Sequence, residues 1–153
     1  MIATTVTRGA LVAEARTWHG TPFKHQGRVR RVGVDCIGLI VQPARDLGMP
    51  CIDDVGYSRQ PDPMHTLECV RQSFVEIPVA DMLDGDVYYI WFGSPDQPHH
   101  FGYKTDVGIL HAYEDVRRGT QKKIRMGRVT ESRFPSDWVR RIHSAWRFKC
   151  WVD

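Results

Sequence analysis

One cysteine of this chain stands in a setting that could make it a nucleophile. In the segment Val34-Asp35-Cys36-Ile37-Gly38, Asp35 is a favourable helix N-cap, which makes Cys36 the first helical residue. Free backbone N–H groups and the positive end of the helix dipole favour a thiolate there, and such settings lower the pKa of a cysteine from about 8.5 to roughly 3.5–7.5. Because Gly38 has no side chain, another element can approach this first turn closely. The segment therefore indicates Cys36 as the candidate nucleophile.

A thiolate nucleophile needs an imidazole partner, and two of the seven histidines are candidates. His100 and His111 fall in neighbouring predicted strands that a hairpin would join. Strand alternation puts His100 on the face opposite Phe101 and Tyr103. With this aromatic face in the core, we expect His100 to face the helix that carries Cys36. His111 can then bond the far nitrogen of the His100 ring and set its tautomer, although a structural core histidine is an equal alternative for His111.

The remaining cysteines carry no pattern that indicates metal or redox chemistry. Cys51, Cys69 and Cys150 form no Cys-x-x-Cys pair, and the chain has no His-Glu-x-x-His motif. His99 and His100 are adjacent, so they point apart in a strand. We expect the three cysteines to be small buried hydrophobes, and we expect no metal ion and no cofactor.

Hydrophobic periodicity predicts the elements that must position these residues. Helices are expected over residues 7–18, 35–47 and 63–74, and Pro43 should break or bend the second of them. Residues 20–34 are expected to form a loop. The rest of the chain is rich in short β-type segments, and we expect strands at 74–79, 86–92, 100–104, 107–113, 124–130 and 144–149, with a short helical stretch after Pro135. This order predicts an α+β domain in which N-terminal helices pack on a C-terminal antiparallel sheet.

Length and composition fit one ordinary globular domain spanning residues 1–153. The chain is 42% hydrophobic and 25% charged, which excludes intrinsic disorder and a disulfide-dense mini-protein. Its apolar runs fall short of the roughly 18 residues that cross a bilayer. The first six residues lack a basic region followed by an apolar one, so we expect no secretory signal. The net charge of +3 is dispersed, which favours solvated loops over a nucleic-acid surface.

The candidate residues lie within segments that resemble the NlpC-type cell-wall cysteine peptidases, a papain-like family. The resemblance spans about residues 10–115, most of the chain, and keeps the family's order of cysteine before histidine. The segments are Gly20-Thr21-Pro22-Phe23 with Gly27 and Gly33-Val34-Asp35-Cys36-Ile37-Gly38-Leu39-Ile40, then Asp84-Gly85-Asp86-Val87, and finally His100-x-Gly102-Tyr103 followed by Ile109-Leu110-His111-Ala112.

The resemblance implies a role for each candidate residue. Cys36 would be the nucleophile, His100 the base and acid, and His111 the residue that orients His100, while Asp35 would help hold the free amine of the substrate. The family typically hydrolyses peptide bonds of bacterial peptidoglycan stem peptides, often between γ-D-glutamate and diaminopimelate. The compact form, with Ile37 after the cysteine, resembles versions encoded by bacteriophages. This implies a hydrolase made in the host cytoplasm that acts with phage tail proteins or is released at lysis.

Two departures from the family pattern leave alternatives open. Phe23 stands where the family usually has a tyrosine whose hydroxyl lies near the oxyanion. The spacing from His100 to His111 is one residue shorter than usual, so His99 is the alternative catalytic base; the glycine at position 102 favours His100. A rival interpretation is a tail-tip structural or wall-binding protein with little or no turnover, and a third is an amidase or acyltransferase that uses the same dyad.

Overall fold

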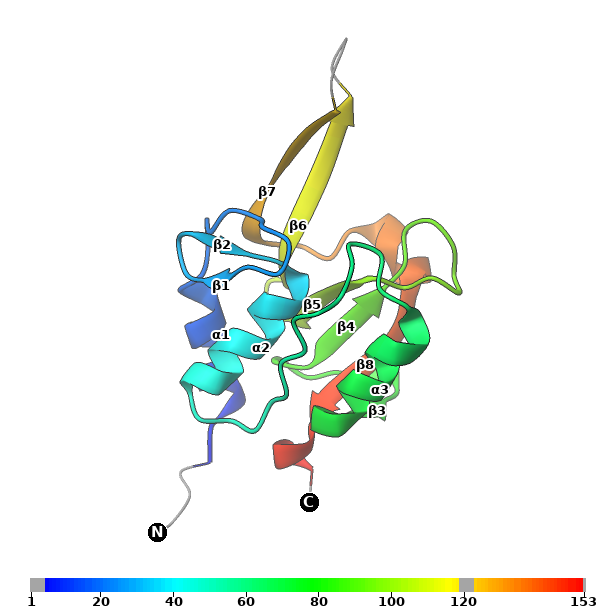
Figure 1. Ribbon diagram of the computed structural model, residues 1–153. Helices are drawn as coiled ribbons and strands as arrows, with labels where there is room; N and C mark the ends of the chain where they lie inside the picture. The colour runs from blue at the N-terminus through cyan, green and yellow to red at the C-terminus, as the bar shows by residue number, and fades with distance from the viewer. Residues whose placement is uncertain (1–4, 119–122, 153) are drawn as a thin grey trace.

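Three α-helices precede most of the sheet along the chain in the computed structural model, which describes residues 5–118 and 123–152 (Figure 1). They are α1 (Arg8–Arg16), α2 (Cys36–Asp46) and α3 (Pro63–Ser73). Side-chain oxygens cap all three, from Thr7, Asp35 and Asp62 respectively. No helix among the described residues combines the length and the apolar character needed to cross a membrane.

A six-stranded sheet forms the centre of the described fold, and all its neighbouring strands are antiparallel. Its spatial order is β3-β8-β4-β5-β6-β7, so the last strand of the chain inserts between two earlier ones. The hairpin of β6 and β7 extends beyond the other strands (Figure 1). The strands are β3 (Phe74–Ile77), β4 (Val87–Ile90), β5 (His100–Lys104), β6 (Ile109–Arg118), β7 (Lys123–Ser132) and β8 (Ile142–Phe148).

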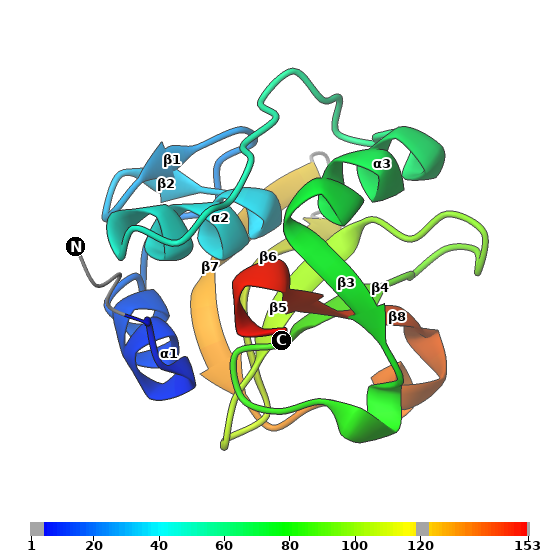
Figure 2. The same ribbon diagram turned by 90° about the horizontal axis from the view of Figure 1, so that it is seen from below.

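The two faces of the sheet bury different clusters, because side chains alternate along each strand. One face packs against the helices: the rings of Tyr89 and Phe101 stack at 4.3 Å, and the Tyr103 hydroxyl donates to the carbonyl of Ile40 in α2. The other face packs beneath the 3-10 helix Ser136–Arg141 through Trp138. Figure 2 shows α2 and α3 on one side of the sheet and this 3-10 helix on the other.

The predicted α+β class, with helices on an antiparallel sheet, is confirmed, and the predicted elements are all present with shifted ends. The helix α2 continues through Pro43 to Asp46, so the break predicted there is wrong, while the alternative of a bend stays a prediction. An interior proline costs about 3 kcal/mol, and the burial of apolar side chains such as Val41 and Ala44 on either side of it offsets this cost. The expected loop at residues 20–34 contains a small two-stranded hairpin, β1 (Arg28–Val29) and β2 (Gly33–Val34).

Candidate active site

Cys36 is the first residue of α2, as the sequence predicts. The Asp35 carboxylate accepts a hydrogen bond from the Gly38 N–H at 2.8 Å and thereby caps the helix. A Cβ atom at Gly38 would lie 2.5 Å from the carbonyl oxygen of Gly27. The expected close approach of another element to this turn is therefore confirmed, and the element is the loop before β1.

The Cys36 thiol is buried against the start of β5, at 9% exposure of the residue. Its Sγ lies 3.8 Å from the carbonyl oxygen of His99. Burial raises the pKa of this thiol to about 12, and the Asp35 carboxylate adds to the rise, while backbone N–H groups of Phe101 and Ile37 act in the opposite direction. The lowered pKa predicted from the helix start is therefore wrong for the free protein: the loss of solvation outweighs the N–H groups.

The rings of His100 and His111 form a buried pair. Nε2 of His100 lies 2.7 Å from Nδ1 of His111, which confirms the bond expected between these side chains. Burial holds the pKa of His100 well below its ordinary value and lowers the pKa of His111 to about 4, so both rings are neutral at pH 7. A Cβ atom at Gly102 would lie 2.6 Å from Cδ1 of Ile109, so the glycine of the His-x-Gly segment is what allows β6 side chains to pack closely here.

The predicted orientation of His100 is wrong. Phe101 and Tyr103 pack on the α2 side, so alternation turns His100 to the opposite face, among aromatic rings that include Phe92 and Trp138. Among the described residues, no hydrogen bond joins the Cys36 thiol to the His100 ring. The prediction assumed that Phe101 and Tyr103 pack into a core on the face of the sheet away from α2, whereas they pack against α2 itself.

Cys36 and His100 nevertheless line the same cleft, which has a volume of about 760 Å³. His99 lines it too, and its Nδ1 lies 3.2 Å from the carbonyl oxygen of Gln97. The choice between His99 and His100 as catalytic base stays a prediction. Other side chains of the cleft wall come from the loop before β1, from the segment before α3 and from the segment after β4; they include Phe23, His25, Tyr57, Arg59 and Phe92.

Asp35 is buried, and protein donors surround both of its carboxylate oxygens. Besides the Gly38 N–H, it accepts hydrogen bonds from the Gln26 N–H at 2.7 Å, from the Tyr57 hydroxyl at 2.5 Å and from Nη1 of Arg28 at 3.0 Å. This network fixes α2, the loop before β1 and the segment before α3 relative to one another. The substrate-amine contact implied by the family resemblance stays a prediction. A substrate amine would share a carboxylate that already accepts hydrogen bonds from four protein groups.

Replacing Asp35 by alanine should lower the free energy of unfolding by about 3 kcal/mol or more, because it removes a helix cap and breaks a buried charge pair with Arg28. Urea denaturation would measure the loss. Thr7→Ala is the matched control: it removes only the cap of α1, where the Thr7 hydroxyl accepts from the Ala10 N–H, and should cost about 1 kcal/mol. Equal losses in the two variants would contradict the network described for Asp35.

The buried histidine pair should make stability fall as the pH decreases below 6.5. An unfolded histidine takes up a proton near that pH, whereas His111 stays neutral in the folded protein down to about pH 4. The unfolded state therefore binds more protons between these values, and His111 alone should reduce the free energy of unfolding by about 3 kcal/mol over this interval. The lowered pKa of His100 also makes the free energy of unfolding decrease as the pH falls. Urea denaturation at several pH values should show a flatter profile for His111→Gln than for the wild type.

Tyr57 is a cleft residue that the sequence analysis missed. It lies in the turn-rich stretch before α3, where neither periodicity nor a motif indicates a site. Its hydroxyl donates to Asp35 and accepts from Nη2 of Arg28 at 2.8 Å. Burial and the nearby Asp35 carboxylate raise the pKa of Tyr57, so it keeps its proton. A phenolic hydroxyl is thus present in the cleft although Phe23 provides none.

Comparison with known proteins indicates which family and fold this chain resembles. A curated relative, the probable endopeptidase NlpC of Escherichia coli (strain K12), is 31% identical over 102 residues, which are 65% of this chain and 57% of the relative. A solved lipoprotein-like structure of the NLP/P60 family from Staphylococcus aureus subsp. aureus Mu50 matches 94% of this chain with a TM-score of 0.58 at 15% identity. The comparisons support the resemblance of this chain to the NlpC/P60 family. The α+β fold of this chain is accordingly that of NlpC/P60 structures.

The similarity has a defined extent. This chain spans 57% of the length of the E. coli NlpC relative and 43% of the S. aureus chain. The NlpC/p60 domain of the peptidoglycan hydrolase SagA is 25% identical, with 69% of this chain and 80% of that chain covered and a TM-score of 0.46. No family model matches the chain.

Proposed function

We propose that this protein is a cysteine peptidase that hydrolyses amide bonds in the stem peptides of bacterial peptidoglycan. The observation that carries the proposal is the shared cleft: Cys36, at the start of α2, and His100, paired with His111, both line it. The similarity to the probable endopeptidase NlpC adds support from the sequence. A nucleophile, a base and an orienting residue are the parts that amide hydrolysis by a thiol requires.

In the proposed reaction, His100 takes the thiol proton as the sulfur attacks the scissile carbonyl. Because Cys36 is protonated in the free protein, the bound substrate must bring the sulfur and Nδ1 of His100 to hydrogen-bonding distance; such contacts commonly tighten only in the substrate complex. The oxyanion forms beside the backbone N–H of Cys36 at the helix start. His100 then protonates the leaving amine, a thioester remains on Cys36, and a water activated by His100 releases the acid.

The bond we propose lies between γ-D-glutamate and diaminopimelate, as the family resemblance implies. Such a peptide carries carboxylates on both sides of the scissile amide. Arg59, half-exposed on the cleft wall, pairs through Nη1 with Glu114 at 3.3 Å, and its other guanidinium N–H groups can bind one of these carboxylates. The Asp35 carboxylate would then lie on the side of the free amine.

Mass spectrometry of peptidoglycan fragments tests this function. Purified cell walls are incubated with the wild type and with Cys36→Ala, and the soluble products are compared. The proposed activity gives fragments that end in γ-D-glutamate together with diaminopimelate peptides that carry a new amine. Fragments with an intact stem peptide freed from the glycan would instead identify an amidase, and no new fragment at all would contradict hydrolysis.

A second candidate function is wall binding without turnover. The observation that favours it is the protonated state of the thiol, whose pKa burial raises to about 12, together with the absence of a tyrosine hydroxyl at position 23. Saturable binding to purified walls, with no amine released over hours, would support this candidate.

We also propose that the protein acts with a bacteriophage tail. The support is the resemblance of the segments around Cys36 and His111 to versions encoded by phages. Peptide mass spectrometry on purified tails would detect the protein there. Its absence from tails, with presence only in lysates, would favour release at lysis.

A further inference from the structure

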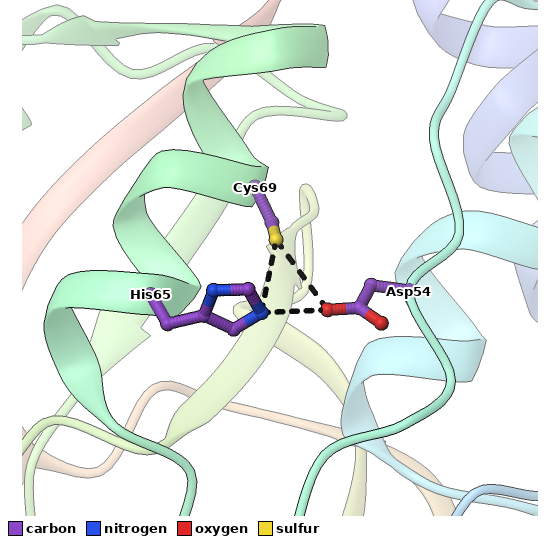
Figure 3. A group of neighbouring side chains, drawn as sticks. All are labelled: Asp54, His65 and Cys69. Carbon is purple, nitrogen blue, oxygen red and sulfur yellow. Dashed lines mark hydrogen bonds and ion pairs between the residues drawn. The ribbon is translucent and has the colours of Figure 1, made fainter.

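A second cluster of chemically reactive side chains lies outside the cleft residues used above. Asp54, from the segment before α3, meets His65 and Cys69 on the surface of α3 (Figure 3). Oδ2 of Asp54 lies 2.9 Å from Nε2 of His65 and 3.5 Å from Sγ of Cys69, and the Sγ and Nε2 atoms are 3.7 Å apart. Three different ligand-type atoms therefore converge on one point.

The local sequence explains how this cluster forms. His65 and Cys69 are four residues apart, so they share one face of α3. Asp62 caps the helix by accepting from the Met64 N–H at 3.1 Å, which fixes where α3 begins and hence where His65 points. Asp54 reaches this face from across the turn-rich segment. The expectation of no metal rested on motifs within single segments, and such motifs do not include a ligand contributed by another segment.

The spacing of the three atoms matches the edges of a tetrahedral zinc site. Zinc bonds of about 2.3 Å to sulfur, 2.0 Å to nitrogen and 2.0 Å to oxygen place neighbouring ligand atoms roughly 3.3–3.6 Å apart. The separations of 3.5 and 3.7 Å from sulfur agree with this, and the 2.9 Å separation between Asp54 and His65 needs to open by only a few tenths of an ångström.

The same geometry argues against a second nucleophilic triad. In such a triad the base contacts the nucleophile through one ring nitrogen and the orienting carboxylate through the other. Here Asp54 and Cys69 both approach Nε2 of His65 (Figure 3). A shared approach to one ring nitrogen is what metal coordination requires, since a single ion would occupy the point between the three atoms.

We propose that Asp54, His65 and Cys69 bind a divalent transition metal ion, with Zn²⁺ as the best match. A thiolate, an imidazole and a carboxylate together suit Zn²⁺ rather than Mg²⁺ or Ca²⁺, and the two anionic ligands balance its charge. Binding releases the thiol proton of Cys69 to solvent. The His65 side chain is 59% exposed and that of Asp54 39%, so the ion can enter directly and keep a water as fourth ligand.

Such an ion would stabilise one wall of the cleft. The segment that carries Asp54 also carries Asp53, whose carboxylate pairs with Nε of Arg28 at 3.1 Å, and Tyr57, which bonds Asp35. A metal bond from Asp54 to α3 would anchor this segment at a second place. The metal site is thus a structural one, separate from the chemistry of Cys36.

Titration with Co²⁺ alone, followed by absorption, tests the site. The wild type should bind one equivalent, with the visible bands of tetrahedral cobalt and a thiolate-to-cobalt charge-transfer band. Cys69→Ser should lose that band and bind at least about tenfold more weakly, and His65→Gln should bind similarly weakly. The burial predicted for Cys69 and Cys150 is wrong, because Cys69 is only partly buried and Cys150 is exposed. Cys150→Ser is the matched control, since it removes an exposed thiol elsewhere and should leave the titration unchanged.

Two further measurements make the result decisive. Zn²⁺ should raise the Tm of the wild type and of Cys150→Ser but not that of Cys69→Ser, whose fold is checked by circular dichroism. Titration of Cys36→Ala excludes coordination at the cleft if its spectrum matches the wild type. Equal Co²⁺ spectra and affinities in Cys69→Ser and the wild type, loss of the bands in Cys36→Ala, or no binding by the wild type would each overturn the proposal.

Discussion

Replacing Cys36 by alanine should abolish the release of new amines from purified peptidoglycan, with a fall in rate of about 10⁴-fold or more. The sulfur forms the covalent intermediate in the proposed reaction, and removal of a nucleophile costs a factor of this order because the remaining groups act only through it. Quantitative mass spectrometry of fragments, with initial rates from the wild type at matched protein concentration, measures the loss.

The control for this variant is the exposed thiol at position 150. Cys150→Ser should keep the wild-type rate, and Cys36→Ala should keep the wild-type fold, because alanine at the first helical residue leaves the Asp35 cap intact. Circular dichroism and urea denaturation check the fold. Hydrolysis by Cys36→Ala at the wild-type rate would exclude Cys36 as the nucleophile. No hydrolysis by the wild type or by Cys36→Ala would favour the wall-binding function.

The position of Cys36 could be predicted from the sequence, whereas its protonation state could not. An N-cap aspartate, a small residue at position 38 and the following apolar stripe are local signals, and local signals fix a helix start. The pKa of the thiol depends instead on which elements cover it. Burial against β5, far away in the sequence, raises that pKa to about 12 and outweighs the local N–H groups.

The histidine pair shows the same division between local and long-range information. The predicted contact between His100 and His111 is confirmed, because both residues lie in one hairpin, where strand alternation and the short turn determine which side chains are neighbours. Which face of that hairpin meets α2 depends on how the whole sheet is assembled. The position of β8 between β3 and β4 was equally unpredictable, because strand pairing across 50 residues or more leaves no pattern in a single sequence.

The Asp54–His65–Cys69 cluster illustrates why a motif search overlooks some sites. The spacing of His65 and Cys69 on one helix face was readable from the sequence. The third member was not, because the turn-rich segment before α3 has no periodicity that would place Asp54. Sites assembled from a helix and an irregular segment become visible only when the fold brings them together.

Replacing His100 by alanine should lower kcat about 10³-fold, while His99→Ala should change it by less than about tenfold. The His100 ring is neutral, its Nε2 is held by His111, and among the described residues its Nδ1 has no hydrogen-bond partner, which leaves that nitrogen for the thiol proton. His99 instead directs its Nδ1 toward a backbone carbonyl beside an exposed turn.

The same comparison decides which histidine is the base. Because His100 is buried, His100→Gln serves as a second variant that fills more of the site, and circular dichroism verifies that both variants fold. His111→Asn should retain more activity than either, since it removes an orienting group and leaves the proton acceptor in place. If His99→Ala loses three orders of magnitude and His100→Ala does not, the base is His99, and the His100–His111 pair is structural.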